Sequence, residues 1–261
     1  MTDETDVAER RTNVSDAHTA QPSLQGRRVL VTGGTTGIGR AISVLLASEG
    51  ARIFICGRNP QHLDDALKRL GEVGEASGIN VDLAERSSID RLFGEADRFL
   101  GGLDVAIINA AIPADETAET PEDDLYYQTS VDFTAYLATA KAAISRMKPG
   151  SDMIFIGSMS AVSRGPGSSI YVAAKAGIEG YAQSLRKELA EKDIKVGLIE
   201  PGFTGADFQY PDFPPKKQRE LINKHQMLRA EDIAVAAHFM LTQPRRTTVS
   251  VMRVETRLDH P

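Results

Sequence analysis

An apolar run passes into a helical pattern through the stretch LVTGGTTGIG at residues 30–39. Gly33 allows a sharp turn, Gly37 lets a pyrophosphate approach the backbone, and Gly39 lets the helix pack closely on a sheet. The free N–H groups at the start of the helix would then face the phosphates. The stretch predicts a strand, a turn and a helix that bind a dinucleotide; the alternative is a glycine-rich turn without a ligand.

Outward from this turn, short apolar runs alternate with helical patterns along the chain. Strands are expected at 29–32, 52–56, 78–81, 105–108, 152–156, 195–199 and 248–254. Helices are expected at 38–48, 60–70, 87–100, 121–147, 171–191 and 230–241. Strands that are apolar on both faces indicate a parallel sheet covered on both sides. The pattern predicts an α/β protein: a single Rossmann-type doubly wound domain whose mostly parallel seven-stranded sheet carries helices on both faces.

Two segments depart from this rhythm. Residues 1–25 are acidic and lack apolar periodicity, which is typical of a disordered tail, so the folded domain is expected at 26–261. Residues 203–227 contain Pro211, Pro214 and Pro215 and form a long connection at the carboxyl edge of the sheet. Long connections there are usually functional, so this segment is expected to be a loop that covers the substrate.

Composition narrows the class of function. The net charge of −6 argues against nucleic-acid binding, which normally needs a basic face. The apolar runs are too short to span a bilayer, so no membrane partner is expected. The single cysteine, Cys56, excludes an internal disulfide and fits a cytoplasmic location, and it is expected to be a packed strand residue. The five histidines lie at no ligand spacing, so no metal site is expected.

Four motifs occur in a characteristic order. They are the glycine turn, Asn109-Ala110-Ala111 after the fourth strand, Tyr171-x-x-x-Lys175, and Pro201-Gly202 after the sixth strand. In this order the chain resembles the short-chain dehydrogenase/reductase family from about residue 26 to residue 241. The resemblance implies a cofactor site made by Gly33, Thr35, Gly37, Ile38, Gly39, Arg58, Asp82, Leu83, Asn109, Ala110, Tyr171, Lys175, Pro201, Gly202 and Thr204.

The end of the second strand bears on cofactor choice. An acidic residue there binds the ribose 2′-hydroxyl of NAD, but this chain has Gly57-Arg58 and no carboxylate. A guanidinium matches a 2′-phosphate, so NADP(H) is expected to be preferred, with NAD(H) possible. The alternative is that Arg58 is simply solvated.

The reaction chemistry is expected at Tyr171, Lys175 and Ser158. Tyr171 and Lys175 are four residues apart near the start of a helix and therefore share one face. A carbonyl that accepts hydride gains negative charge on oxygen, and a phenol can donate a proton to it. A neighbouring ammonium lowers the pKa of the phenol. The resemblance implies that Ser158 orients the carbonyl and that Lys175 also holds the nicotinamide ribose. The alternative is that Tyr171 is a core residue, Lys175 a surface charge and Ser158 a turn hydroxyl.

Two positions depart from the family pattern. Asp132 stands where the family usually has an asparagine that anchors a water linked to the lysine, so Asp132 is included among the catalytic candidates. Ala206 stands where the family has a threonine near the nicotinamide carboxamide, and Thr204 is the candidate substitute.

These features predict an oxidoreductase that transfers hydride between NADP(H) and a carbonyl or alcohol carbon of a small organic substrate, most simply a ketone or aldehyde reductase. The alternatives are an NAD-dependent alcohol dehydrogenase and a non-catalytic cofactor-binding protein. Substrate-pocket candidates are Ile112, Met159, Arg164, Phe203 and Phe208. The resemblance also implies a homodimer or homotetramer that pairs through the helices at 121–147 and 171–191.

Overall fold

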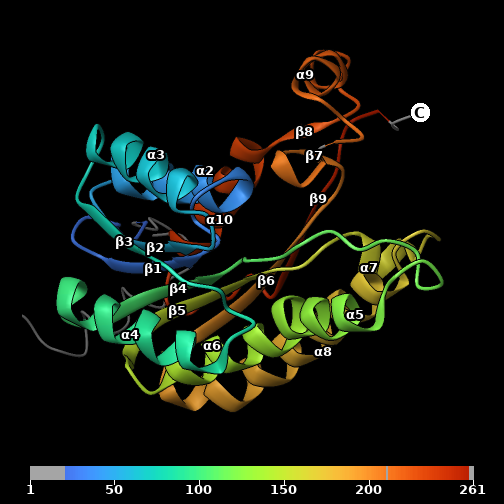
Figure 1. Ribbon diagram of the computed structural model, residues 1–261. Helices are drawn as coiled ribbons and strands as arrows, with labels where there is room; N and C mark the ends of the chain where they lie inside the picture. Colours follow the sequence, from blue (N-terminus) through green and yellow to red (C-terminus); the bar gives the residue numbers. More distant parts are fainter. Residues whose placement is uncertain (1–20, 210, 259–261) are drawn as a thin grey trace, which may run out of the picture.

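The computed structural model of the chain describes residues 21–209 and 211–258 (Figure 1). The strands are β1 (Arg28–Thr32), β2 (Arg52–Gly57), β3 (Ala76–Asn80), β4 (Leu103–Ile108), β5 (Met147–Ile156), β6 (Lys195–Pro201), β7 (Thr204–Gly205), β8 (Leu228–Arg229) and β9 (Val251–Val254). The α-helices are α2 (Gly37–Ser48), α3 (Pro60–Gly71), α4 (Arg86–Leu100), α5 (Glu122–Thr129), α6 (Ala135–Ile144), α7 (Ser160–Ser163), α8 (Ser169–Leu189), α9 (Pro215–Asn223) and α10 (Ala230–Leu241).

Seven strands form one parallel sheet in the order β3-β2-β1-β4-β5-β6-β9, which confirms the predicted fold class. The strand order reverses between β1 and β4. Loops that leave the carboxyl ends of strands diverge at such a switch point, so a crevice opens there. The arrangement therefore places the ligand site above β1 and β4.

Helices cover both faces of the sheet, and a separate apolar core fills each side (Figure 1). On one face α2, α3 and α10 pack against residues such as Val31 and Ile55. On the other face α4, α6 and α8 pack against residues such as Leu30 and Phe155. Neighbouring strand residues point to opposite faces, so Leu30 and Val31 belong to different cores.

The long helix expected at 121–147 is interrupted and ends early. It consists of α5, a π-helical turn at Ser130–Thr134, and α6, which stops at Ile144. The π-helical turn carries Asp132, and π-helical insertions often occur at functional sites. Strand β5 already begins at Met147, five residues before the strand expected there, because Leu103 of β4 pairs with Met147 ahead of a register shift.

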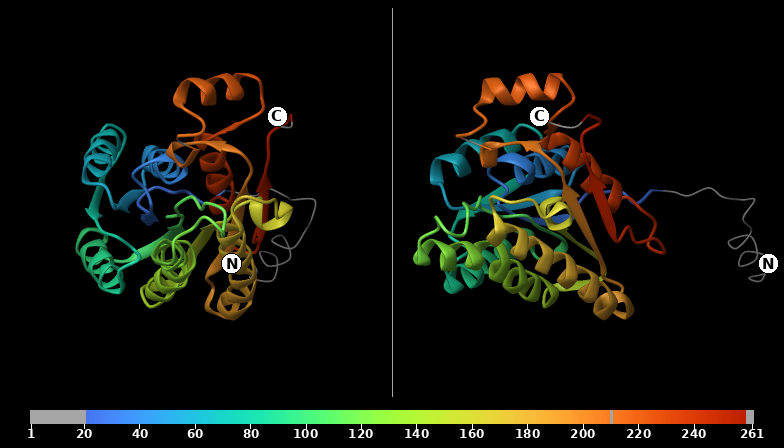
Figure 2. Two further views of the ribbon diagram at one scale, coloured as in Figure 1. Left: turned by 45° about the vertical axis from the view of Figure 1, so that its right-hand side comes forward. Right: turned by 90° about the vertical axis from the view of Figure 1, so that its right-hand side faces the viewer.

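The segment at 203–227 is not a structureless loop. It contains β7, a 3₁₀ turn at Asp207–Gln209 and helix α9, and β7 pairs with β8 in a small parallel sheet. Figure 2 shows α9 and this pair lying together outside the layers of the main sheet. The prolines suggested a loop in the sequence. Pro215, however, stands at the first position of α9, where proline is favourable.

Of the tail expected at 1–25, residues 1–20 lie outside the described residues and residues 21–25 lie within them. Leu24 is buried in the core shared with α10, and Gly26 donates a backbone hydrogen bond to Gly50. The packed chain therefore includes Leu24, ahead of the boundary expected at residue 26.

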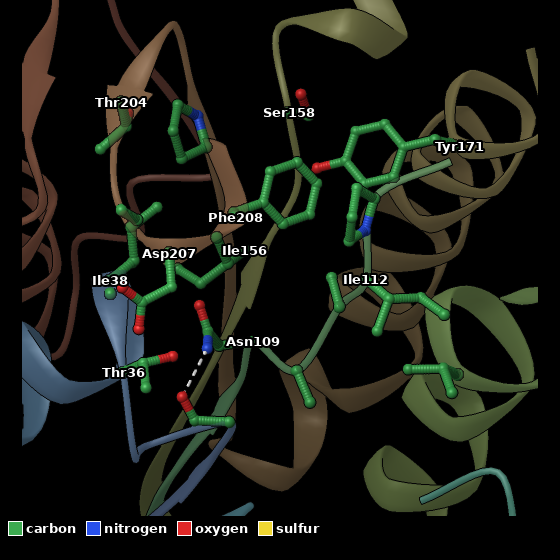
Figure 3. Close-up of a pocket in the computed structure, with 18 of the residues that line it drawn as sticks. Thr36, Ile38, Asn109, Ile112, Ile156, Ser158, Tyr171, Thr204, Asp207 and Phe208 are labelled. Carbon is green, nitrogen blue, oxygen red and sulfur yellow. Dashed lines mark hydrogen bonds between the residues drawn. The ribbon is translucent and has the colours of Figure 1, made fainter. Parts of the chain in front are cut away.

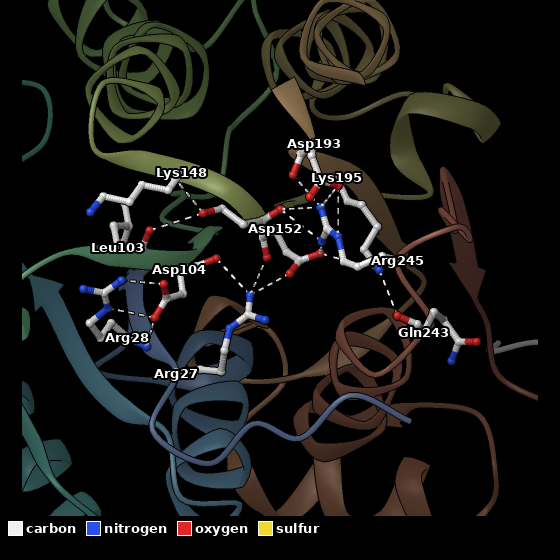
Figure 4. Close-up of polar contacts among 12 residues, drawn as sticks. Arg27, Arg28, Leu103, Asp104, Lys148, Asp152, Asp193, Lys195, Gln243 and Arg245 are labelled. Carbon is white, nitrogen blue, oxygen red and sulfur yellow. Dashed lines mark hydrogen bonds and ion pairs between the residues drawn. The ribbon is translucent and has the colours of Figure 1, made fainter. Parts of the chain in front are cut away.

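An ionic cluster ties the amino ends of the central strands together (Figure 4). The buried carboxylate of Asp152 on β5 pairs with Arg27 at 2.7 Å, with Arg245 at 2.9 Å and with Lys195 at 3.6 Å. Arg27 lies just before β1, Arg245 lies in the segment after α10, and Lys195 begins β6. The cluster lies at the edge of the sheet opposite the crevice, so it stabilises the fold without facing the candidate site.

Candidate functional site

A cleft of about 710 Å³ opens above the carboxyl ends of the sheet (Figure 3). Its walls come from the loops after β1, β2, β3, β4, β5 and β6 and from the start of α8. The cleft lining includes Gly33, Thr35, Gly37, Ile38, Arg58, Asp82, Leu83, Asn109, Ala110, Ser158, Tyr171, Lys175, Pro201, Gly202 and Thr204. The fold therefore brings together residues spread over most of the chain.

The glycine turn has the backbone that its sequence suggests. Gly33 and Gly37 both adopt positive φ, of 64° and 52°, a region that side chains disfavour. A Cβ on Gly33 would lie 2.8 Å from the Cα of Ala110, so the turn is held against the loop after β4. Gly39 does not line the cleft; a Cβ there would collide with the carbonyl of Gly33. Gly39 therefore allows close packing of the helix start against the turn and Asn109, and it is not among the residues that line the cleft, although it was expected in the cofactor site.

Asn109 clamps the turn from the neighbouring strand. Its side-chain amide donates to the carbonyl of Thr32 at 3.0 Å and to that of Gly33 at 3.3 Å. The Thr32 hydroxyl in turn accepts from the backbone N–H of Asn109 at 2.9 Å. These bonds fix the turn against the loop after β4.

The far end of the cleft carries Arg58, immediately after β2. Its guanidinium donates a 2.9 Å hydrogen bond to the phenol oxygen of Tyr127 on α5, and that phenol donates to Asp82 at 2.7 Å. Cys56 is buried in one of the two cores, and burial raises the pKa of its thiol to about 12. A thiol that keeps its proton packs as an apolar residue, as expected for Cys56.

At the near end, Ser158, Tyr171 and Lys175 face one another. Burial raises the pKa of the Tyr171 phenol, and a hydrogen bond with the Ser158 hydroxyl opposes that rise. The Lys175 ammonium lies 5.4 Å from the centre of the Tyr171 ring. Residues 158, 171 and 175 meet because α8 begins directly beside the end of β5.

Lys175 is 1% exposed, and neutral groups hold its ammonium. It donates to the phenol oxygen of Tyr136 at 2.8 Å and to the carbonyl of Ile156 at 3.0 Å. Burial lowers the pKa of Lys175 to about 8, while the charge of Asp132 acts in the opposite direction. The negative charge of Asp132 therefore stabilises the protonated form of Lys175.

Asp132 is fully buried behind the cleft wall and does not line the cleft itself. One carboxylate oxygen accepts a 2.8 Å hydrogen bond from the backbone N–H of Ile112. Burial raises the pKa of Asp132 to about 6, and the charge of Lys175 limits that rise. The same carboxylate raises the pKa of Tyr171, so the three groups are electrostatically linked.

The family model for short chain dehydrogenases matches residues 27–216 of the chain. The chain belongs to the short-chain dehydrogenase/reductase family. An uncharacterized oxidoreductase of Staphylococcus aureus (strain MRSA252) is 31% identical over 234 residues, which cover 88% of this chain and 97% of the relative. The 3-oxoacyl-[acyl-carrier-protein] reductase of Haemophilus influenzae is 31% identical over 222 residues, which cover 83% and 91%.

Solved structures agree with this membership. A short chain dehydrogenase from Burkholderia cenocepacia J2315, crystallised in complex with NADP, is 27% identical and superposes with a TM-score of 0.81. The alignment covers 90% of this chain and 98% of the Burkholderia protein. The short-chain dehydrogenase/reductase fold therefore spans the glycine turn, the cleft and the segment after β6.

As a member of this family, the chain shows its own features around the segment after β6. The Thr204 hydroxyl donates to the carbonyl of Gly202 at 2.9 Å, so that hydroxyl is already engaged within the turn. The Phe208 ring lies 5.5 Å from the Tyr171 ring, and Figure 3 shows the Asp207 carboxylate directed towards the glycine turn beside Thr36. This short-chain dehydrogenase/reductase thus places a carboxylate where its glycine turn faces the cleft.

Most predicted pocket residues lie where they were expected. Ile112, Met159, Phe203 and Phe208 line the cleft, and Arg164 does not, because its side chain folds back to the carbonyl of Ala161. Within the described ranges 21–209 and 211–258, no cluster of three or more His, Cys, Asp or Glu side chains could hold a metal. The described helices include none with both the length and the apolar character to cross a membrane.

Sequence reasoning missed Tyr136, Tyr127 and Asp207. Tyr136 follows Asp132 by four residues, a helical spacing that could have suggested a shared site. Tyr127 and Asp207 carried no such signal, because their contacts join segments that are far apart in the sequence.

Proposed function

We propose that this short-chain dehydrogenase/reductase uses NADP(H) to reduce the carbonyl of a small ketone or aldehyde. The observation that carries the proposal is one continuous cleft with Ser158, Tyr171 and Lys175 at one end, Arg58 at the other and the glycine turn between them. Such a cleft unites the segments expected to bind a dinucleotide and keeps a phenol at its reactive end.

The residues of the cleft fit the cofactor. The positive φ of Gly37 and its lack of a side chain suit a pyrophosphate against the start of α2, whose N–H groups attract anions. Arg58 would bind the 2′-phosphate, and no carboxylate at the end of β2 would repel it. The NADP complex of the related Burkholderia protein supports this choice.

The chemistry that NADPH supplies when bound is a hydride for the carbonyl carbon. Tyr171 donates its phenol proton to the carbonyl oxygen as negative charge develops there. Ser158 donates a hydrogen bond to the same oxygen and orients it. Lys175 stabilises the resulting phenolate, because an ammonium beside a phenol favours its ionised form.

The substrate end of the cleft is mostly apolar, with Ile112, Met159, Phe203 and Phe208 around the reactive phenol. An apolar wall favours a carbonyl that carries a hydrocarbon substituent. The related Haemophilus reductase acts, by its name, on a 3-oxoacyl group, which has such a substituent. We therefore place 3-oxo esters and thioesters first among the candidate substrates.

The test is a screen that follows NADPH consumption over ketones, aldehydes, quinones, keto acids, 3-oxo esters and 3-oxo thioesters. We expect turnover on at least one class, and we expect Tyr171→Phe to abolish it while NADPH binding stays nearly intact. Near-native turnover by Tyr171→Phe would refute the assigned role of the phenol. Tighter binding of NADH than of NADPH would favour an NAD-dependent alcohol dehydrogenase instead.

We also propose that the chain works in the cytoplasm as a homodimer or homotetramer that pairs through α5–α6 and α8. The buried single thiol of Cys56 is compatible with a reducing compartment. Light scattering that gives only the 28.2 kDa monomer would rule out the assembly.

A further inference from the structure

Tyr127 stands between two opposite charges at the far end of the cleft. Its phenol oxygen accepts the Arg58 hydrogen bond at 2.9 Å and donates its proton to Asp82 at 2.7 Å. The three side chains come from α5, from the residue after β2 and from the loop after β3, and all three line the cleft. The contact therefore joins three separate segments at the place where Arg58 faces the cleft.

We propose that Tyr127 is the residue that makes Arg58 selective for a ribose 2′-phosphate. A guanidinium paired directly with a carboxylate is partly neutralised and already has its donors engaged. Within the part of the chain that the structure describes, Arg58 forms no direct ion pair, because the phenol of Tyr127 lies between it and Asp82. The uncharged phenol holds the guanidinium of Arg58 in place without neutralising its positive charge.

The donor count supports this role. A guanidinium has five N–H donors, and the Tyr127 bond engages only one nitrogen of Arg58. The remaining donors stay available for a phosphate. Burial and the Asp82 carboxylate raise the pKa of the Tyr127 phenol, so the phenol keeps its proton and remains a donor to Asp82.

Loss of the phenol hydroxyl has a defined consequence. In Tyr127→Phe, Arg58 loses its phenol partner, and Asp82 keeps only the backbone N–H of Ala84 as a donor. The guanidinium would then pair with Asp82, in competition with a 2′-phosphate. The inference rests on the proposed function, because it assumes that Arg58 receives that phosphate.

The experiment measures dissociation constants for NADPH and NADH, and for adenosine 2′,5′-bisphosphate and AMP, by fluorescence or calorimetric titration. The variants are Tyr127→Phe, Arg58→Ala and the double variant. Tyr126→Phe is the matched control, since Tyr126 is its neighbour on α5 and is 63% exposed. Thermal unfolding of each variant verifies that it is folded.

We expect Tyr127→Phe to weaken NADPH and adenosine 2′,5′-bisphosphate about tenfold, the usual effect of one charge-assisted hydrogen bond. NADH and AMP should change less than about threefold, and Tyr126→Phe should change neither pair. In the Arg58→Ala background, the added Tyr127→Phe change should have no further effect on NADPH.

Two outcomes would overturn the inference while the proposed function stands. One is a loss of NADPH affinity in Arg58→Ala but not in Tyr127→Phe, and the other is equal weakening of NADPH and NADH by Tyr127→Phe. If the unmodified protein binds NADPH and NADH equally and Arg58→Ala changes neither, the NADP(H) preference fails and the inference fails with it.

Discussion

Lys175 on α8 donates a 2.8 Å hydrogen bond to the phenol oxygen of Tyr136 on α6. The Tyr136 hydroxyl lies 2.9 Å from the carbonyl of Asn109 and 3.1 Å from that of Ile156, either of which can accept its proton. The phenol thus links the ammonium to the ends of β4 and β5. Because it is uncharged, it holds the lysine without neutralising it, which leaves Asp132 to balance the charge.

Tyr136→Phe should move the alkaline limb of the rate profile to lower pH. The ammonium loses one of its two acceptors, so the pKa of Lys175 should fall further below about 8. A charge-assisted hydrogen bond is worth about 1.5 kcal/mol, which corresponds to roughly one pH unit. The measurement is kcat against pH, and Tyr181→Phe, a tyrosine on α8 whose ring packs on Phe155, is the control. Identical profiles for Tyr136→Phe and the unmodified protein would contradict the coupling.

Asp132→Asn should give an active enzyme with a shifted pH dependence. Asparagine retains an acceptor for the N–H of Ile112 but removes the charge that raises the pKa of both Tyr171 and Lys175. Both limbs linked to these groups should therefore move to lower pH. A limb of the rate profile near pH 6 that arises from titration of Asp132 itself should disappear, because asparagine does not titrate. The profile is again kcat against pH; an inactive but folded variant would show that Asp132 has a direct role in the reaction.

Asp207→Asn should tighten binding of NADPH and NADH to a similar extent. The Asp207 carboxylate is directed towards the glycine turn, where the pyrophosphate is proposed to bind (Figure 3). Removal of a like charge at roughly 8 Å is worth up to about 2 kcal/mol, so a gain of roughly three- to tenfold is expected at low salt. High salt should reduce the gain. Asp212→Asn on the same segment is the control, and no gain at low salt would show that the carboxylate leaves the cleft when the cofactor binds.

Asp152→Asn should destabilise the fold and leave cofactor affinity unchanged. The buried carboxylate balances Arg27, Arg245 and Lys195, and a neutral amide leaves these cations facing one another. The expected cost is about 2 kcal/mol, less than for a wholly buried pair because the cations are partly exposed. This would lower the melting temperature by roughly 4–8 °C. Asp193→Asn, which removes the exposed partner of Arg245, should cost at most about 0.5 kcal/mol; equal losses in both variants would contradict this account.

Local patterns in the sequence were sufficient for the order of the seven strands of the main sheet, for the helices that cover it and for the glycine turn. The positive φ of Gly33 and Gly37 follows from residue type and position alone. Ser158, Tyr171 and Lys175 were recognisable because Tyr171 and Lys175 share one helical face and because Ser158, just after a strand, completes the spacing of the family. The split of the 121–147 helix was not predictable, since its residues keep a helical pattern through the π-helical turn.

The amino-acid sequence was therefore enough for the fold class, the family resemblance and the residues at the two ends of the cleft. Only the packed structure brought Tyr136 to Lys175 across 39 residues and Tyr127 to Arg58 across 69. Periodicity specifies which face of an element is buried, because burial of apolar surface depends on local sequence. Contacts between polar side chains of different elements depend on how those elements rotate and shift against one another. That arrangement is reached only when both cores pack, and it is what gives this enzyme its buried lysine network and its bridged Arg58.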